Sequence, residues 1–565
     1  MNYNTQISFV VENNFLLIPT NTKEEESILE IVDSKKKIIL QFKARIDTTS
    51  KGDLLPIEIS KHRGKELTLN IHSANPIVSA HLSLEQASIS PKRNKLAHHP
   101  IGHLAIEQYP LGTPCGLFVF KNEYLLFSPY KSKDHSDVYQ GWVVAKSSNL
   151  MHWRVNSLPL QLNPISTFKS SHIVLDTENI SNLGKNTILA YFTNSSEDYS
   201  VYLAYKKEGD TSFIPFGNSI LTISSTYSSI DGLKVTYHKQ TSQWVMTICT
   251  DYSIVFYESK DLINWNILSE FKHRGLLASE KWKNPTLQTL RYGKQEKWVL
   301  LITKDNVQKQ IEPQTYYFVG DFDGTTFSGD KHATLLPLDY GTDNAGGVII
   351  HTKNKEKPIY IGYMSNPIYA KELFLNKVPS TMTYPRTLDL TKAKKQYVIA
   401  SYTAKETKVL RVEKNTLSSR LLDKTICLKS ILEDNNGTFE LIIDFDIIDV
   451  DTKYFKLNLS NEVNEHLSYL FHFENNELIA DRSQSDHAHL ISKLTSIPIK
   501  GSLFEIKKYK VKLVIDKTSA ELFINKGKVT MTQQIFPNEP YNTLTLGIEN
   551  GAIDITKLNI YRLER

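Results

Sequence analysis

The sequence predicts an all-β protein, in which a five-bladed β-propeller stands between an N-terminal and a C-terminal β-sandwich. Three observations favour this fold class. Strand-length apolar runs separated by Lys, Gly, Asp or Asn turns recur along all 565 residues. Helical periodicity is scarce, and aromatic residues, which pack well on pleated sheets, make up 10% of the chain. A turn-plus-strand unit with a fixed tryptophan also repeats in the central region.

Residues 1–92 are expected to form the N-terminal β-sandwich. Apolar and polar residues alternate there in short bursts, as at Leu67, Leu69 and Ile71, and this period of two is typical of antiparallel strands with one buried face. Residues 88–95 contain a proline and several basic residues. They are interpreted as a linker to the next domain.

Residues 96–392 are expected to form the propeller. Residues 148–153 (SNLMHW) and 260–265 (KDLINW) are copies of one turn-plus-strand unit, and each follows an aliphatic strand. Residues 243–246 (QWVM) and 297–300 (KWVL) form a second repeat. Radially repeated sheets of about four strands each give about five blades in a segment of this length. The repeated tryptophans are expected in the blade cores: Trp142, Trp153, Trp244, Trp265 and Trp298.

Residues 396–565 are expected to form the C-terminal β-sandwich. Residues 511–516 alternate in the manner of a strand, and residues 521–524 form one arm of a hairpin whose turn is Asn525-Lys526-Gly527. No chemistry is indicated by this pattern alone.

Composition excludes several classes of function. The net charge is only +5, from 66 basic and 61 acidic residues without a concentrated run, so no nucleic-acid partner is expected. Three distant cysteines, Cys115, Cys249 and Cys427, predict neither a disulfide framework nor a metal cluster. No apolar run of membrane-spanning length occurs. The chain shows no signal peptide, so we expect a cytoplasmic protein, or a periplasmic or extracellular one if an export signal was removed.

Short motifs stand in order along the propeller segment. They are Gly112-Thr113-Pro114-Cys115-Gly116, Phe168-Lys169-Ser170-Ser171-His172, Asp231-Gly232-Leu233-Lys234-Val235, Trp282-Lys283-Asn284-Pro285 and Met382-Thr383-Tyr384-Pro385-Arg386. In order and spacing they resemble the Asn-Asp-Pro-Asn-Gly, Phe-Ser-Gly-Ser-Ala, Arg-Asp-Pro-Lys-Val, Trp-Glu-Cys-Pro and Met-Thr-Leu-Pro-Arg blocks of glycoside hydrolase family 32, the invertases, levanases and inulinases. The N-terminal domain is similar to the extra domain of a Bacteroidetes-type subset, with Leu16-Leu17-Ile18-Pro19 and Gly64-Lys65 at matching places.

The resemblance implies a retaining mechanism whose catalytic carboxylates are missing here. The family nucleophile, transition-state stabiliser and acid/base positions correspond to Thr113, Gly232 and Lys283. Retaining hydrolysis needs two carboxyl groups about 5 Å apart around an oxocarbenium-like transition state. A threonine hydroxyl needs a base, and a lysine cation has the wrong sign for that transition state. Asp231 is the one acid beside its expected place, and a slipped register would aim it into the cavity.

Three residues are predicted to contact a glycan: Trp282, Asp343 and Asp231. Trp282 stands in a loop motif, where a role in the core or in the ligand wall is possible, and Asp343 follows a loop-like Asp-Tyr-Gly-Thr in which a turn role is equally possible. Glu280 is interpreted as a surface loop residue. No metal or other cofactor is expected, because His98, His99 and His103 have no supporting carboxylate cluster in the sequence.

The leading functional hypothesis is therefore a family 32-like pseudoenzyme that binds a fructan or another glycan, or supports an active relative. One alternative is an active fructan or sucrose β-fructosidase with relocated catalytic groups that include Asp231. A second alternative is a structural or protein-binding propeller. Hydrolysis assays and calorimetry against fructans separate the three.

Overall fold

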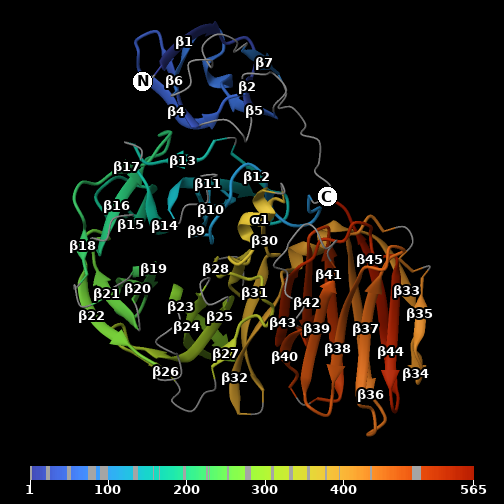
Figure 1. Ribbon diagram of the computed structural model, residues 1–565. Helices are drawn as coiled ribbons and strands as arrows, with labels where there is room; N and C mark the ends of the chain where they lie inside the picture. Colours follow the sequence, from blue (N-terminus) through green and yellow to red (C-terminus); the bar gives the residue numbers. More distant parts are fainter. Residues whose placement is uncertain are drawn as a thin grey trace.

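The computed structural model confirms the all-β prediction, and Figure 1 shows a propeller with one sandwich at its side and a smaller one above it. The structure describes these residues: 3–20, 26–47, 53–73, 84–88, 99–131, 138–156, 158–163, 166–194, 199–223, 227, 230–250, 253–273, 281–306, 311–329, 335–352, 357–375, 378–393, 395–429, 431–432, 435–485, 498–504 and 506–565. Most of the predicted linker and Glu280 lie outside these ranges.

Two antiparallel sheets form the N-terminal sandwich. Their strands are β1 (Tyr3–Val10), β2 (Phe15–Thr20), β3 (Glu26–Asp33), β4 (Ile38–Arg45), β5 (Asp53–Glu58), β6 (Glu66–Ser73) and β7 (Glu85–Ala87), with a 3₁₀ turn at Ser60–His62. The strand orders are β1-β6-β3-β4 and β5-β2-β7. The alternating residues Leu67, Leu69 and Ile71 point into the shared core as predicted. Leu158 of the propeller packs against this core.

The propeller has five blades (Figure 1). Blade I comprises β9 (Gly116–Phe120), β10 (Glu123–Lys131), β11 (Tyr139–Ser147), β12 (Arg154–Val155) and β13 (Leu160–Gln161); blade II comprises β14 (Phe168–Asp176), β15 (Thr187–Asn194), β16 (Ser200–Lys206), β17 (Ile214–Pro215) and β18 (Leu221–Thr222). Blade III comprises β19 (Ile230–His238), β20 (Gln243–Thr250), β21 (Ile254–Ser259) and β22 (Asn266–Phe271); blade IV comprises β23 (Lys281–Tyr292), β24 (Gln295–Asn306), β25 (Ile311–Phe322), β26 (Phe327–Gly329) and β27 (Leu336–Pro337).

Blade V closes the ring. It contains β28 (Gly347–Ile350), β29 (Ile359–Met364), β30 (Ser380–Met382), β31 (Arg386–Ala393) and β32 (Gln396–Thr403), with the short helix α1 (Ala370–Leu375) between β29 and β30. The strand β8 (Ala105–Ile106), from the start of the propeller segment, pairs with β30. Because β32 pairs with β31 along its length, the last blade extends to Thr403, beyond the end at residue 392 that the sequence predicts.

The repeated sequence unit corresponds to one repeated loop. It follows β11 in blade I and β21 in blade III, where the side chains of Asn149 and Asp261 accept hydrogen bonds from the backbone amides two and three residues ahead. Leu150 and Leu262 then adopt positive φ values of 68° and 65° and are fully buried. The shared loop geometry explains why these two segments resemble each other.

Two larger sheets form the C-terminal sandwich, after a 3₁₀ segment at Lys405–Leu410. One contains β33 (Arg411–Leu417), β34 (Arg420–Leu422), β36 (Phe439–Ile447), β41 (Lys508–Asp516), β42 (Ser519–Ile524), β43 (Val529–Gln534) and β45 (Ile553–Leu563). The other contains β35 (Ile426–Leu428), β37 (Tyr454–Ser460), β38 (His466–His472), β39 (Glu477–Gln484), β40 (Ile499–Ser502) and β44 (Thr543–Glu549). Both sheets share one large apolar core. The predicted hairpin turn between β42 and β43 has positive φ at Asn525, Lys526 and Gly527.

Candidate functional site

The candidate site lies among the innermost strands of the propeller. The strands β9, β14, β19, β23 and β28 contact one another in sequence and close a ring around the axis. Thr113 stands in the loop just before β9, Gly232 lies in β19 and Lys283 lies in β23. The three positions that the sequence resemblance assigns to the family's catalytic carboxylates are therefore carried by blades I, III and IV, and all lie at the inner ring.

Two β-bulges shape this region. In β19 the pairing passes from Ile230 opposite Thr250 to Leu233 opposite Ile248, so that Asp231 and Gly232 together face one residue. In β23 it passes from Lys283 opposite Thr303 to Thr286 opposite Leu301, which leaves Asn284 and Pro285 in the second bulge. Bulges of this kind redirect side chains and are common beside active sites.

The two bulges pack against each other and leave no room for a side chain at position 232. Gly232 has a φ of 154°, and a Cβ atom there would lie 2.7 Å from the backbone nitrogen of Asn284 and 3.1 Å from Cδ of Pro285. Real Cβ atoms do not approach backbone atoms so closely. An aspartate at this place would require the neighbouring bulge to move.

The hydroxyl of Thr113 is committed to a backbone contact. Thr113 Oγ1 donates to the carbonyl oxygen of Ala345 at 2.9 Å, and Nδ2 of Asn284 donates to the same oxygen at 3.3 Å. Thr113, Asn284 and Ala345 thus tie blades I, IV and V together. A carbonyl oxygen cannot remove the proton that a nucleophilic hydroxyl must lose, so this contact does not activate Thr113.

Asp231 and Lys283 are the charged side chains at the bulges. Both are half-buried, and both interact with neighbouring groups. Burial, and secondarily the charge of Asp231, raise the pKa of the Cys249 thiol well above its ordinary value. Asp231 and Gly232 lie in the same β-bulge. The backbone beside Asp231 therefore has the irregular pairing that a one-residue shift in register requires.

A buried cation lies beside the Thr113 loop, and no pattern in the sequence indicates its burial. Lys234 is 5% exposed and donates from Nζ to the carbonyl oxygen of Pro114 at 3.2 Å. Burial lowers the pKa of Lys234 to about 8 and raises that of Cys115 to about 11. Burial and the Lys234 charge also hold the pKa of His172 well below its usual value. Lys234 and His172 both belong to quoted motifs, but only the strand geometry shows that they meet.

Trp282 and Asp343, which the sequence places at the ligand site, have other contacts in the structure. Trp282 is 2% exposed and packs with Cys249, Phe256 and other apolar residues between blades III and IV. Asp343 is fully buried, forms an ion pair with Arg482, and accepts hydrogen bonds from Tyr369 and from the amide of Gln534. Trp282 therefore offers no open ring face, and Asp343 joins the propeller to the C-terminal sandwich.

The described ranges contain neither a metal-binding cluster nor a membrane-spanning helix. Within them, no three His, Cys, Asp or Glu side chains are grouped so that they could hold a metal ion. None of the helices in the same ranges has the length and apolarity needed to cross a bilayer.

Comparison with known proteins identifies the family. Residues 103–401 match the model described as "Glycosyl hydrolases family 32 N-terminal domain", and residues 401–562 match "Glycosyl hydrolases family 32 C terminal". These two matches cover the propeller and the C-terminal sandwich. The chain belongs to glycoside hydrolase family 32.

Individual relatives are distant in sequence. The chain is 26% identical to a levanase of Bacillus subtilis (strain 168) over 492 residues, which cover 83% of this chain and 71% of the levanase. It is also 26% identical to a levanbiose-producing levanase of the same organism over 437 residues, covering 74% and 82%. The crystal structure of exo-inulinase from Aspergillus awamori superposes with a TM-score of 0.73 at 20% identity, covering 83% of this chain and 99% of the inulinase. This last likeness shows a shared fold.

Proposed function

We propose that this family 32 protein is a non-catalytic glycan-binding protein that takes a fructan or a related glycan at the inner ring of its propeller. One observation carries the proposal: none of the three positions that correspond to the catalytic carboxylates presents one. Thr113 bonds a backbone carbonyl, Gly232 has no space for a side chain, and Lys283 is a cation.

The chemistry of retaining hydrolysis explains why these changes matter. The reaction needs a carboxylate nucleophile and a carboxylic acid about 5 Å apart, and its transition state carries positive charge on the sugar ring. Preorganised negative charge usually contributes most to stabilising such a state. Lys283, at the acid/base position, would oppose that charge, and the buried Lys234 adds a second cation beside the Thr113 loop.

The polar groups at the bulges suit hydrogen bonds to sugar hydroxyls. Asp231, Lys283 and Asn284 supply polar groups at the bulges, and Thr113 Oγ1, which donates its proton to Ala345, retains lone pairs that accept from a sugar hydroxyl. The relatives with the names levanase and levanbiose-producing levanase cover most of this chain. Levan-type and inulin-type fructans are therefore the first ligands to test.

Calorimetric titration of the purified chain with levan, inulin and sucrose tests binding. We expect a fructan to bind, and Thr113→Val and Lys283→Met to weaken its binding about five- to tenfold, because each removes one or more hydrogen-bonding groups. Lys297→Met is the matched control, since Lys297 lies away from the inner ring and pairs with Asp321. Absence of heat at millimolar ligand would contradict the proposal and favour a structural or protein-binding propeller.

A second candidate function is hydrolysis with relocated groups, and Asp231 is the observation that favours it. It is the one half-buried carboxylate in the bulge at the stabiliser position. Turnover of sucrose, levan or inulin that depends on Asp231 would support this alternative.

A further inference from the structure

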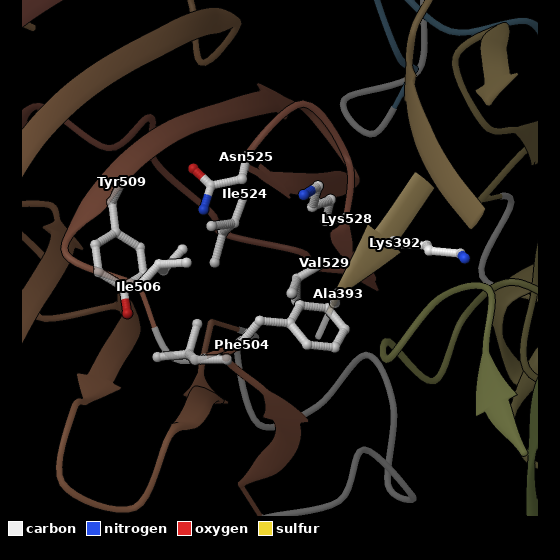
Figure 2. Close-up of a pocket in the computed structure, with 10 residues that line it drawn as sticks. Lys392, Ala393, Phe504, Ile506, Tyr509, Ile524, Asn525, Lys528 and Val529 are labelled. Carbon is white, nitrogen blue, oxygen red and sulfur yellow. The ribbon is translucent and has the colours of Figure 1, made fainter. Parts of the chain in front are cut away.

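A separate cavity of about 240 Å³ lies between the propeller and the C-terminal sandwich (Figure 2). Its walls come from the end of β31, from Leu503, Phe504 and Ile506 between β40 and β41, from Tyr509 of β41, and from the β42–β43 hairpin. Thr113, Gly232 and Lys283 of the inner ring do not contribute to it. The cavity is therefore separate from the candidate site at the inner ring.

The interior of the cavity is apolar. Leu503, Ile524 and Val529 are at most 2% exposed, and Phe504 and Ile506 complete the wall (Figure 2). An apolar cavity of about 150 Å³ already accommodates benzene, so this one has room for a short hydrocarbon.

Three polar residues also line the cavity, beside the half-buried Ala393, Phe504 and Ile506. They are Lys392, which is exposed, and Asn525 and Lys528, which are half-buried. The Nζ atom of Lys392 lies 5.1 and 4.6 Å from the ring centres of Tyr292 and Tyr397, and in Figure 2 it points away from the other lining residues.

Lys528 is the charge that faces this space. Within the described parts of the chain it has no ion-pair partner, and no Asp or Glu of those parts lines the cavity. An apolar chamber beside a cation that pairs with no acid of the described residues is complementary to an amphiphile with an apolar body and an anionic head. A sugar would instead bury hydroxyl groups against Leu, Ile and Val without partners, which is unfavourable.

We propose that this cavity binds a medium-chain aliphatic carboxylate, with its alkyl chain against Leu503, Ile524 and Val529 and its carboxylate at Lys528. The apolar walls supply the affinity, since burial of alkyl surface is favourable. Lys528 selects the anionic head group. The ligand bridges the β31 end of the propeller and the hairpin of the sandwich, so its binding stabilises their contact.

Calorimetric titration of the full-length chain with octanoate, octanol and octylamine tests the site. We expect octanoate to bind, octanol to bind about tenfold more weakly, and octylamine to bind more weakly still. Lys528→Gln weakens octanoate about tenfold without changing octanol. Lys526→Gln is the matched control, because Lys526 lies in the same turn, is exposed and does not line the cavity; it leaves both affinities unchanged. Ala393→Phe fills the space and abolishes binding of both ligands.

If Ala393→Phe does not fold, photolabelling of the wild-type chain tests the same site without a variant. A photoreactive octanoate analogue should label peptides that contain residues 503–506 or 524–529 of the wild-type chain. Labelling confined to other regions, equal affinity for octanoate and octylamine, an unchanged octanoate affinity in Lys528→Gln, or no binding at millimolar octanoate would each overturn the proposal.

Discussion

Carboxylates are arranged differently in two regions of the molecule: the inner ring of the propeller, and the interface between the propeller and the C-terminal sandwich. At the interface, Arg386 forms ion pairs with Glu521 and, at 2.8 Å, with Asp339, while His103 lies 2.7 Å from Asp516 and 2.8 Å from Glu521. All five side chains are at most 1% exposed. Each buried charge there has a partner, as burial requires.

The inner ring, by comparison, has no carboxylate at the three positions that the resemblance assigns to the catalytic acids. Its three family positions hold Thr113, Gly232 and Lys283, and the half-buried Asp231 is the acid beside them. The interface carboxylates hold the propeller and the sandwich together, whereas the architecture of the inner ring is maintained without carboxylates at these three positions. Under the proposed function, a family 32 chain loses its catalytic groups and keeps its architecture.

The largest expected effect comes from breaking the interface network. Arg386→Met leaves Glu521 and Asp339 buried without their cation, so we expect the free energy of unfolding to fall by about 3–5 kcal/mol. Urea unfolding followed by tryptophan fluorescence measures it. Lys500→Ala, which removes an exposed pair with Glu477, is the control and should cost less than about 1 kcal/mol. Equal losses in the two variants would contradict the role assigned to the network.

Placing an aspartate at position 232 should damage the inner ring. Gly232→Asp combines an unfavourable φ with a clash at the Asn284 backbone, and we expect it to lower the free energy of unfolding by about 3 kcal/mol. Gly293→Asp is the control, because Gly293 has a φ of 61° but nothing within 4 Å of an added Cβ. It should cost about 1 kcal/mol. If the two variants lose equal stability, the steric account of position 232 is wrong.

The stability of the interface should also depend on pH. Asp516 and Glu521 outweigh the burial of His103 and raise the pKa of its imidazole to about 9. A folded-state pKa above the unfolded value of about 6.5 stabilises the protein fully below pH 6.5, and this contribution is lost as the pH rises to 9. We expect the loss to amount to about 3 kcal/mol.

The difference between wild type and His103→Gln isolates this effect. Lys234, whose pKa is lowered to about 8, has the opposite sign, and its titration stabilises the fold between pH 8 and its ordinary pKa near 10.5. Because both proteins contain Lys234, its contribution cancels. Parallel stability curves for the two proteins from pH 6 to 9 would show that His103 is not held protonated.

Local patterns in the sequence predicted much of the fold. The copies at residues 148–153 and 260–265 mark equivalent loops of blades I and III, and the turn at Asn525-Lys526-Gly527 forms where its residue types require it. Each depends on backbone geometry within a few residues. The all-β class, the five blades and the sandwiches followed from such signals.

The long-range contacts could not be predicted in this way. Asp343 was expected to contact a ligand, but its partner Arg482 lies 139 residues away, and no local pattern indicates such a pairing. Likewise, the sequence shows a glycine at position 232, whereas the obstruction there comes from the bulge at Asn284 in another blade. The burial of Lys234 likewise results from contacts between inner strands of different blades.

The most direct test of the central claim is a hydrolysis assay of the purified wild-type chain with sucrose, levan and inulin, beside Asp231→Asn. If the inner ring lacks catalytic groups, neither protein releases reducing sugar above a heat-denatured control. Wild-type turnover of about 1 s⁻¹ or more, within the ordinary range of enzymes, and its loss in Asp231→Asn would contradict the account and show that relocated groups perform the reaction.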